Sequence, residues 1–129
     1  MIRTALLVAL SGLLLACAGD EAVLLGPQEW DDTRFIVESR PSPIRQGMTE
    51  FIVIATRDKS RPGVGFVVSL RASEDRDWRQ AIQDGYTGVY RRAVWVEDPL
   101  GGRLAVHVKK KDGAETTLYF PFPAAAGAN

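Results

Sequence analysis

Short runs of apolar residues, separated by glycine, proline and aspartate, dominate the sequence after residue 32. The clearest run, Arg103–Lys109, alternates apolar and polar side chains, as a β-strand with one buried face does. The other runs are rich in β-branched and aromatic residues and end at turn-forming residues. We therefore expect strands at Thr33–Ser39, Glu50–Arg57, Gly65–Arg71, Tyr86–Val96, Arg103–Lys109 and Thr116–Phe120.

Strands at this spacing, without a sustained helical period, predict an all-β fold. The length fits an immunoglobulin-like antiparallel β-sandwich of about six to seven strands. One short helix is expected at Asp75–Gln83, where Trp78, Ala81 and Ile82 recur at helical spacing. The pair Arg91-Arg92 interrupts the longest apolar run and predicts a bulge or bend there.

The N-terminus has the pattern of an export signal. Arg3 gives one positive charge, and the uncharged run Ala5–Ala16 follows. A bilayer-spanning helix needs about 20 apolar residues, so this run fits the helix of a cleavable signal peptide better than a permanent span.

The end of this run, Leu14-Leu15-Ala16-Cys17, resembles the lipobox of bacterial lipoproteins. The resemblance implies cleavage between Ala16 and Cys17 and a diacylglyceryl group on the Cys17 thiol, so that acyl chains hold the protein to a membrane. Ala18 follows where an aspartate would favour retention in the inner membrane, which implies the periplasmic face of the outer membrane. A plain signal peptide cleaved after Ala18 is the alternative.

The expected organisation is a signal peptide at 1–16, a lipidated N-terminus and tether at 17–32, the sandwich at 33–123 and a flexible tail at 124–129. Gly19, Gly26 and Pro27 punctuate the tether. Free aliphatic clusters are uncommon in spacers, however, so Val23–Leu25 and Trp30 are candidates to dock onto the domain.

Two further segments, Asp84–Tyr90 and Gly102–Val108, together resemble the YtkA-like and FixH-like group of small immunoglobulin-like periplasmic domains. The resemblance would cover about Phe35 to Phe120 and implies a ligand- or metal-binding module. Copper-linked members of that group carry methionine and histidine ligands. The chain after the signal peptide contains only Met48 and His107, so no metal or other cofactor is expected.

Charge and residue inventory exclude several function classes. Sixteen basic and 16 acidic residues balance, which gives no electrostatic footprint for nucleic acid. His107 is expected on the solvent face of its strand, without metal-ligating neighbours in sequence. Glu74, Asp75, Asp77 and Asp84 lie among arginines and lack the spacing of a calcium loop. No nucleophile elbow or phosphate loop occurs, so an enzyme is not expected.

The remaining candidate is aromatic. Tyr119, Phe120 and Phe122, interleaved with prolines near the C-terminus, form a possible partner surface on an edge strand. The sequence therefore predicts a non-enzymatic, lipid-anchored domain of the cell envelope that acts as an interaction or accessory subunit beside another envelope protein. The alternative is the ligand- or metal-binding module that the family resemblance implies.

Overall fold

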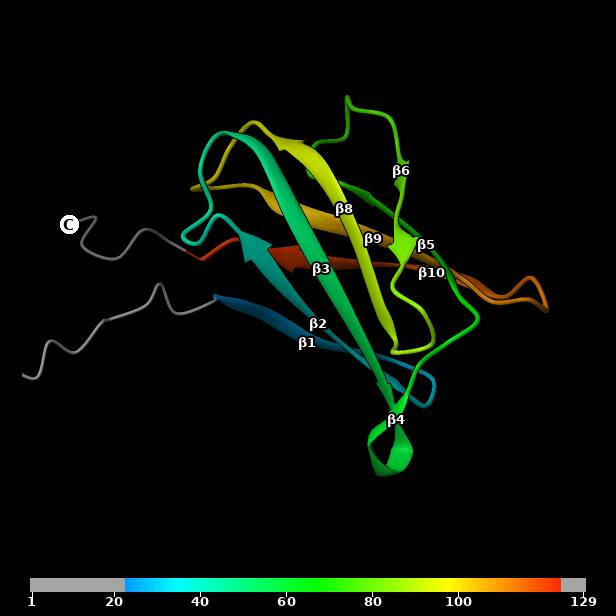
Figure 1. Cartoon of the computed structure of the whole chain (residues 1–129). Coiled ribbons are helices and arrows are strands. Elements are labelled where there is room, and N and C mark those ends of the chain that lie inside the picture. Colours follow the sequence, from blue (N-terminus) through cyan, green and yellow to red (C-terminus); the bar gives the residue numbers. More distant parts are fainter. Residues whose placement is uncertain (1–22, 124–129) are drawn as a thin grey trace, which may run out of the picture.

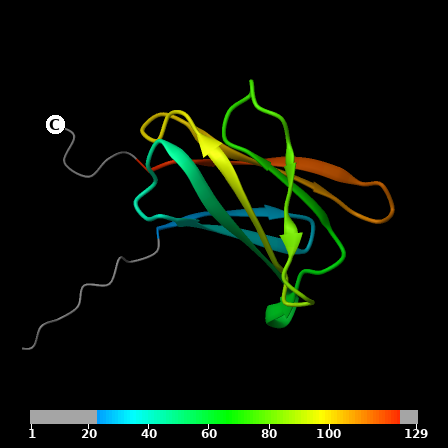
Figure 2. The same cartoon turned by 45° about the horizontal axis from the view of Figure 1, so that its top comes forward.

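Two antiparallel β-sheets packed face to face make up residues 23–123, the part of the chain that the computed structural model describes (Figures 1 and 2). The expected all-β antiparallel sandwich is confirmed. Sheet A contains, in spatial order, β1 (Leu24–Trp30), β2 (Thr33–Arg40), β3 (Gly47–Arg57), β8 (Val89–Val96) and β7 (Ile82–Gln83), with β4 (Arg61–Pro62) paired to the end of β3. Sheet B contains β10 (Glu115–Pro121), β9 (Arg103–Lys109), β5 (Val67–Arg71) and β6 (Arg79–Gln80), and a 3₁₀ turn, η1 (Asp58–Ser60), joins β3 to β4.

The core lies between the sheets and follows directly from the alternation in the sequence. In β9, Leu104, Val106 and Val108 are fully buried, and each faces the other sheet. Strand β2 buries Phe35 and Val37 from the opposite side. Because side chains of a strand alternate between its two faces, each sheet supplies one apolar layer to a shared core.

The expected bulge at Arg91-Arg92 is wrong. The pairing of β8 with β3 runs without a register shift from Gly47↔Val96 to Ile54↔Val89. Arg91 forms ion pairs on the outer face of sheet A, and Arg92 lies near the open side of the sandwich. Both charges therefore stay hydrated within a regular ladder. The irregularity lies in β1, between Leu25 and Gln28.

The expected helix at Asp75–Gln83 is also wrong. This segment contains bends and the two short strands β6 and β7, between which the chain crosses from sheet B to sheet A. Ala81 sits at the crossing, is buried, and donates its N–H to the Val68 carbonyl at 2.7 Å. Trp78 and Ile82 are exposed, so the helical spacing marks no buried stripe. Pairing with two sheets satisfies backbone groups that a helix this short would hold only marginally.

Part of the expected tether belongs to the sandwich. Leu24–Trp30 forms β1 and pairs with β2, Leu25 is buried, and Val23 and Trp30 pack against the core. The expected docking of these residues is confirmed. The signal peptide, Cys17 and the tail at 124–129 lie outside the described residues. Within residues 23–123, no helix is long and apolar enough to cross a membrane.

The two sides of the sandwich differ. On one side β1 and β10 lie next to each other, and the Phe120 ring packs so close to Gly26 that a Cβ there would come within 2.9 Å of it. On the other side lie only the short strands β6 and β7, at the crossing (Figure 1). That second side carries the candidate site.

Candidate functional site

Strand β8 has an unpaired edge over its second half. One neighbour, β3, pairs with it along its whole length. Its other neighbour, β7, pairs only through Ile82↔Arg91 and Gln83↔Tyr90. Beyond the ladder with β3, no backbone hydrogen bond joins residues 92–96 to another residue of the described chain. Residues 92–96 therefore form an unpaired edge of sheet A.

The hydrogen bonds beside this segment show which backbone groups face the empty side. The Gly88 carbonyl accepts from Ala55 of β3, whereas the Val89 carbonyl accepts from Asp84, next to β7, both at 2.8 Å. Backbone groups of successive strand residues point to opposite neighbours. The N–H and C=O groups of Ala93 and Trp95 therefore point away from β3, toward the open edge.

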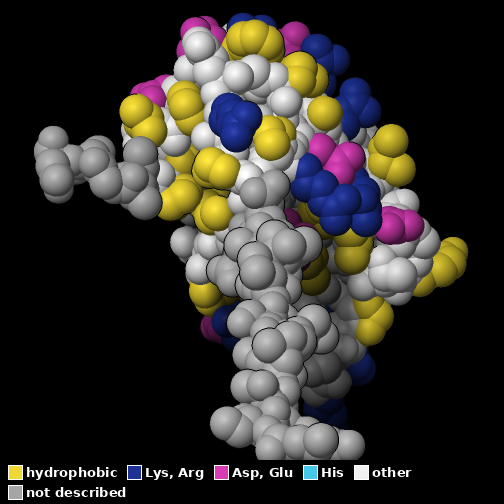
Figure 3. Space-filling model, turned by 60° about the vertical axis from the view of Figure 1, so that its left-hand side comes forward, with side chains coloured by type: hydrophobic (Ala, Val, Ile, Leu, Met, Phe, Trp, Pro, Cys, Tyr) yellow, Lys and Arg dark blue, Asp and Glu magenta, His cyan; other side chains and the backbone are white. Residues whose placement is uncertain are grey.

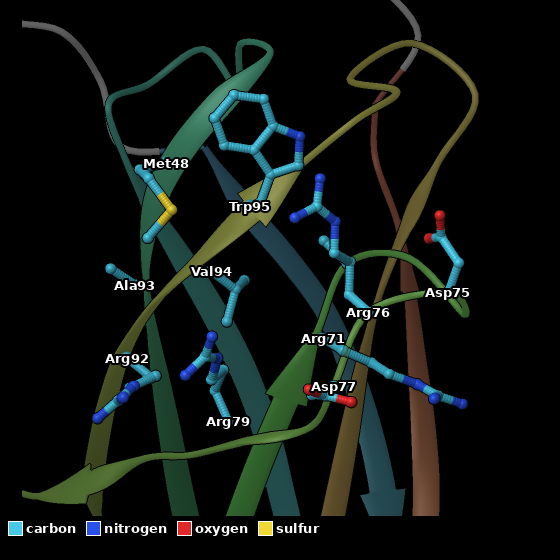
Figure 4. A pocket seen from close by; sticks show the side chains of 11 residues that line it. Met48, Arg71, Asp75, Arg76, Asp77, Arg79, Arg92, Ala93, Val94 and Trp95 are labelled. Atoms are coloured by element: carbon cyan, nitrogen blue, oxygen red, sulfur yellow. The ribbon is translucent and has the colours of Figure 1, made fainter.

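A cleft of about 440 Å³ lies along this edge, between β8 and the segment that connects β5 to β6. Its β8 wall is formed by residues 92–95, with Met48 of β3 beside them. The opposite wall is formed by residues 71–79 (Figure 4). In this view Arg79 extends toward Val94 in the middle of the cleft, and Arg76 extends toward the Trp95 indole. Arg71 points away from β8.

The cleft is basic. Arg76, Arg79 and Arg92 line it, against Asp75 and Asp77. Among residues 23–123, Arg76 has only a 4.0 Å contact with Glu97, and no ion pair to Arg79 or Arg92 is found. On the face seen in Figure 3, by contrast, acidic and basic side chains lie beside one another. The cleft therefore combines two arginines that form no ion pair among the described residues, Arg79 and Arg92, with the Trp95 indole, whose ring centroid lies 5.6 Å from the Arg76 guanidinium.

The register explains why Arg79 and Arg92 line the same cleft. Arg92 pairs across the ladder with Phe51, and Arg79 pairs with Leu70. Both partners are fully buried core residues, and directly opposed residues project to the same face of a sheet. Each arginine therefore projects from its own sheet into the gap between the sheets, at the side where that gap is open.

A second hollow, of about 640 Å³, lies on the outer face of sheet A beside the same edge. It shares Met48, Arg92 and Ala93 with the cleft and adds Ile82, which is 67% exposed. Its other arginine, Arg91, is already neutralised by Glu50 and Asp84, each at 3.7 Å. The open edge is thus flanked by a basic hollow on the inner side and a more apolar one on the outer side.

The aromatic segment singled out by the sequence does not form one surface. Phe120 is fully buried and Phe122 is 6% exposed, with its ring stacked on Phe51 at 6.0 Å between centroids. Only Tyr119 reaches solvent, where the Arg103 guanidinium lies 4.0 Å from its ring centroid. The segment is on an edge strand, as expected, but two of its three aromatic side chains belong to the core.

His107 lies on the outer face of sheet B, as the alternation predicts, and its Nε2 is 3.4 Å from a Glu115 carboxylate oxygen. Met48 lies on the outer face of sheet A, opposite Trp95 in the ladder. The two sheets separate these side chains, so they cannot bind one metal ion together. Within residues 23–123, no group of three or more histidine, cysteine, aspartate or glutamate side chains converges.

The acidic residues that the sequence raised as candidates have local roles. Glu74 contacts Arg103 at 3.3 Å, and Asp84 contacts Arg91. The Ser73 hydroxyl donates a hydrogen bond to Asp75 and lowers the pKa of that carboxyl below its usual range. These contacts are typical of solvated turns rather than of a cation site.

Sequence reasoning missed the basic cleft, although one signal was present. In β8 the inward positions are Tyr90, Arg92, Val94 and Val96, so Arg92 is the single charge in an otherwise apolar series. A charged residue at a core-facing position marks either a buried ion pair or an opening in the core. The sequence pattern instead predicts a bulge or bend at Arg91-Arg92 and places Arg79 in a helix, so neither position indicates the cleft.

The comparisons with known proteins do not assign the chain to a family. No family model matches it, and no curated protein matches it. The resemblance to bacterial lipoproteins and to YtkA-like and FixH-like domains is therefore supported only as far as the two-sheet antiparallel sandwich.

Proposed function

We propose that this protein is a non-enzymatic interaction subunit of the cell envelope, anchored by lipid on Cys17, which binds a partner protein through the basic cleft beside β8. The cleft carries the proposal, because it combines arginine side chains, two of them without an ion pair among the described residues, with the Trp95 indole and unpaired backbone groups. Arginine and tryptophan are the residues that contribute most often to protein–protein binding energy.

The openness of the site favours a protein over a small ligand. Small-molecule sites enclose most of the surface of their ligand, whereas this cleft and the outer hollow form one continuous border along an exposed strand edge. Extended edges of this kind are recognised by other polypeptide chains.

The anchor is tested by intact mass and membrane fractionation of the native protein and of a Cys17→Ser variant. We expect the native protein to lack residues 1–16, to carry acyl mass and to fractionate with membranes, and the variant to do neither. Two or more acyl chains hold a protein stably, because each buried methylene contributes about 0.8 kcal/mol. A freely soluble native protein would refute the anchor.

The partner is tested by site-specific photocrosslinking in the cells that make the protein. A photoreactive residue replaces Ala93 at the open edge or, as a matched control, Thr117 on the outer face of sheet B. We expect one discrete protein adduct from position 93 that is absent from position 117. Equal adducts from both positions, or none from position 93, would contradict binding at the cleft.

A further inference from the structure

We propose that the partner contributes an extended, acidic peptide segment that pairs with residues 92–96 of β8 as an additional strand of sheet A. This inference rests on the proposed function and specifies its binding mode and the chemistry of the partner. Strand addition combines backbone hydrogen bonds, which give affinity, with alternate side-chain contacts, which give specificity.

The backbone of the added strand has a defined place. Strand β7 already occupies the row next to β8, but it pairs with Tyr90 and Arg91 only. A segment that continues this row would meet the N–H and C=O groups of Ala93 and Trp95. The Ala93 side chain is small and exposed, so it does not cover these groups.

Side chains of the added strand would alternate between two different surroundings. Those that point inward would face β6 of the opposite sheet, where Arg79 projects into the gap, and would also lie beside Arg92. Those that point outward would rest in the outer hollow, against Met48 and Ile82, which are 61% and 67% exposed. The alternation favours acidic residues on the inner side and apolar residues on the outer side.

The charges favour a polypeptide over a nucleic acid. The cleft offers Arg76, Arg79 and Arg92 over the length of one short strand, and the chain as a whole has a net charge of zero. Nucleic-acid binding relies on many phosphate contacts along a basic surface. A few carboxylates, spaced two residues apart, match the three arginines instead.

The probe is an acetylated and amidated peptide of alternating aspartate and valine, about eight residues long, a usual strand length. It is titrated into the full-length chain in detergent while backbone amide signals are followed by NMR. We expect saturable binding and, at saturation, hydrogen exchange at the Ala93 and Trp95 amides slowed about tenfold or more, because both become hydrogen-bonded. A peptide with lysine in place of aspartate is expected not to bind.

Two N-methylated forms of the peptide separate strand addition from simple charge attraction. Methylating the amides of one alternate set removes the groups that face β8, and methylating the other set does not. We expect one form to lose binding and the other to keep it. Equal binding by both forms would refute strand addition, even if the peptide remains attracted to the cleft by charge.

Variants of the protein locate the site. Arg79→Ala and Arg92→Ala are each expected to weaken binding about fivefold, the upper range for exposed ion pairs. Arg45→Ala, in an exposed loop outside both hollows, is the control and should change nothing. Ala93→Pro removes an N–H that has no partner and should abolish binding. If that variant fails to fold, the N-methylated peptides give the same information.

The outcomes distinguish this inference from the proposed function. A crosslinked partner from position 93, together with no binding of the probe, would leave the function in place and overturn the acidic strand. Probe binding with all the expected signatures, but no cellular adduct, would support the strand and contradict the function. Protection of the Ala93 and Trp95 amides that rises with protein concentration, without peptide, would assign the edge to a second copy and overturn the proposal.

Discussion

The Tyr90 hydroxyl ties β8 to the buried segment between β4 and β5, through which the chain passes from one sheet to the other, and its removal tests how much this link contributes to stability. Tyr90 is 1% exposed, and its hydroxyl donates a hydrogen bond to the Gly63 carbonyl at 3.0 Å. The Phe66 N–H donates to the same oxygen at 3.4 Å. Tyr90→Phe keeps the ring, which lies 6.5 Å from the Phe66 ring, and removes only these two bonds.

The expected loss of stability follows from the groups left behind. One hydrogen bond has good geometry and one is long, and both backbone partners stay near a buried site after the change. A lost bond with unsatisfied partners costs about 2 kcal/mol of unfolding free energy. For a domain of this size that loss lowers Tm by about 8–16 °C. The urea midpoint should fall by about 1 M.

Urea unfolding followed by tryptophan fluorescence measures the effect, with Tyr86→Phe as the matched control. Tyr86 is 86% exposed, so its hydroxyl contributes little and the control should unfold like the native protein. A loss below about 0.5 kcal/mol in Tyr90→Phe would refute the reasoning, because it would mean that the bonds are replaced by water at no cost.

The pH dependence of the free energy of unfolding tests the role of Tyr90 independently. Burial raises the pKa of the Tyr90 hydroxyl above its ordinary value of 10.0, because the charged form is disfavoured in the core. The unfolded chain then loses this proton at lower pH than the folded chain. The contribution of Tyr90 to stability is therefore full below about pH 10 and declines as the pH rises toward its pKa in the folded protein. The stability gap between the native protein and Tyr90→Phe should narrow above about pH 10, and a gap that widens would refute the assignment.

Four further substitutions test the turns and the core by the same unfolding assay. Gly88→Ala should cost more than about 2 kcal/mol, because the residue has φ +78° and a Cβ would lie 2.5 Å from the Ala55 carbonyl oxygen. Gly113→Ala, at φ +92° with open space around it, should cost only about 1 kcal/mol, and an equal loss in both would remove the steric argument. Phe122→Ala should cost about 3–5 kcal/mol because its ring is buried, which a loss below about 1 kcal/mol would contradict. Asp98→Ala should cost about 1 kcal/mol, because its Oδ1 accepts two backbone N–H bonds in the β8–β9 turn, and an unchanged midpoint would show that the turn holds without them.

Most of the fold is predictable from the sequence because each strand buries one face. Arg103–Lys109 has the same bounds in the prediction and in β9, since seven alternating residues leave no freedom of register. The sequence predicts a tether and not a strand at Leu24–Trp30, because Gly26 and Pro27 interrupt the apolar pattern. The structure accommodates both through a shift in register between Leu25 and Gln28.

The candidate site was not predictable, because it depends on which distant strands lie side by side. Arg79 and Arg92 line one cleft only when β6 and β8 occupy the same open side of two different sheets. No local pattern specifies that arrangement. The helical spacing around Trp78 also concealed the crossing at Ala81, where a single small residue is buried between two very short strands.

The contact between the first and the last strand has a consequence for chain synthesis. Leu25 enters the core from β1, while Phe120 and Phe122 enter from and just after β10, nearly 100 residues later. The early β1–β2–β3 sheet can pair locally, yet the part of its apolar face that Phe120 and Phe122 cover stays exposed to water until these residues emerge. A nascent or truncated chain that stops before residue 120 would therefore leave the side of the core beside β1 uncovered, and would depend on chaperones or be degraded. The sandwich closes only when its last strand arrives.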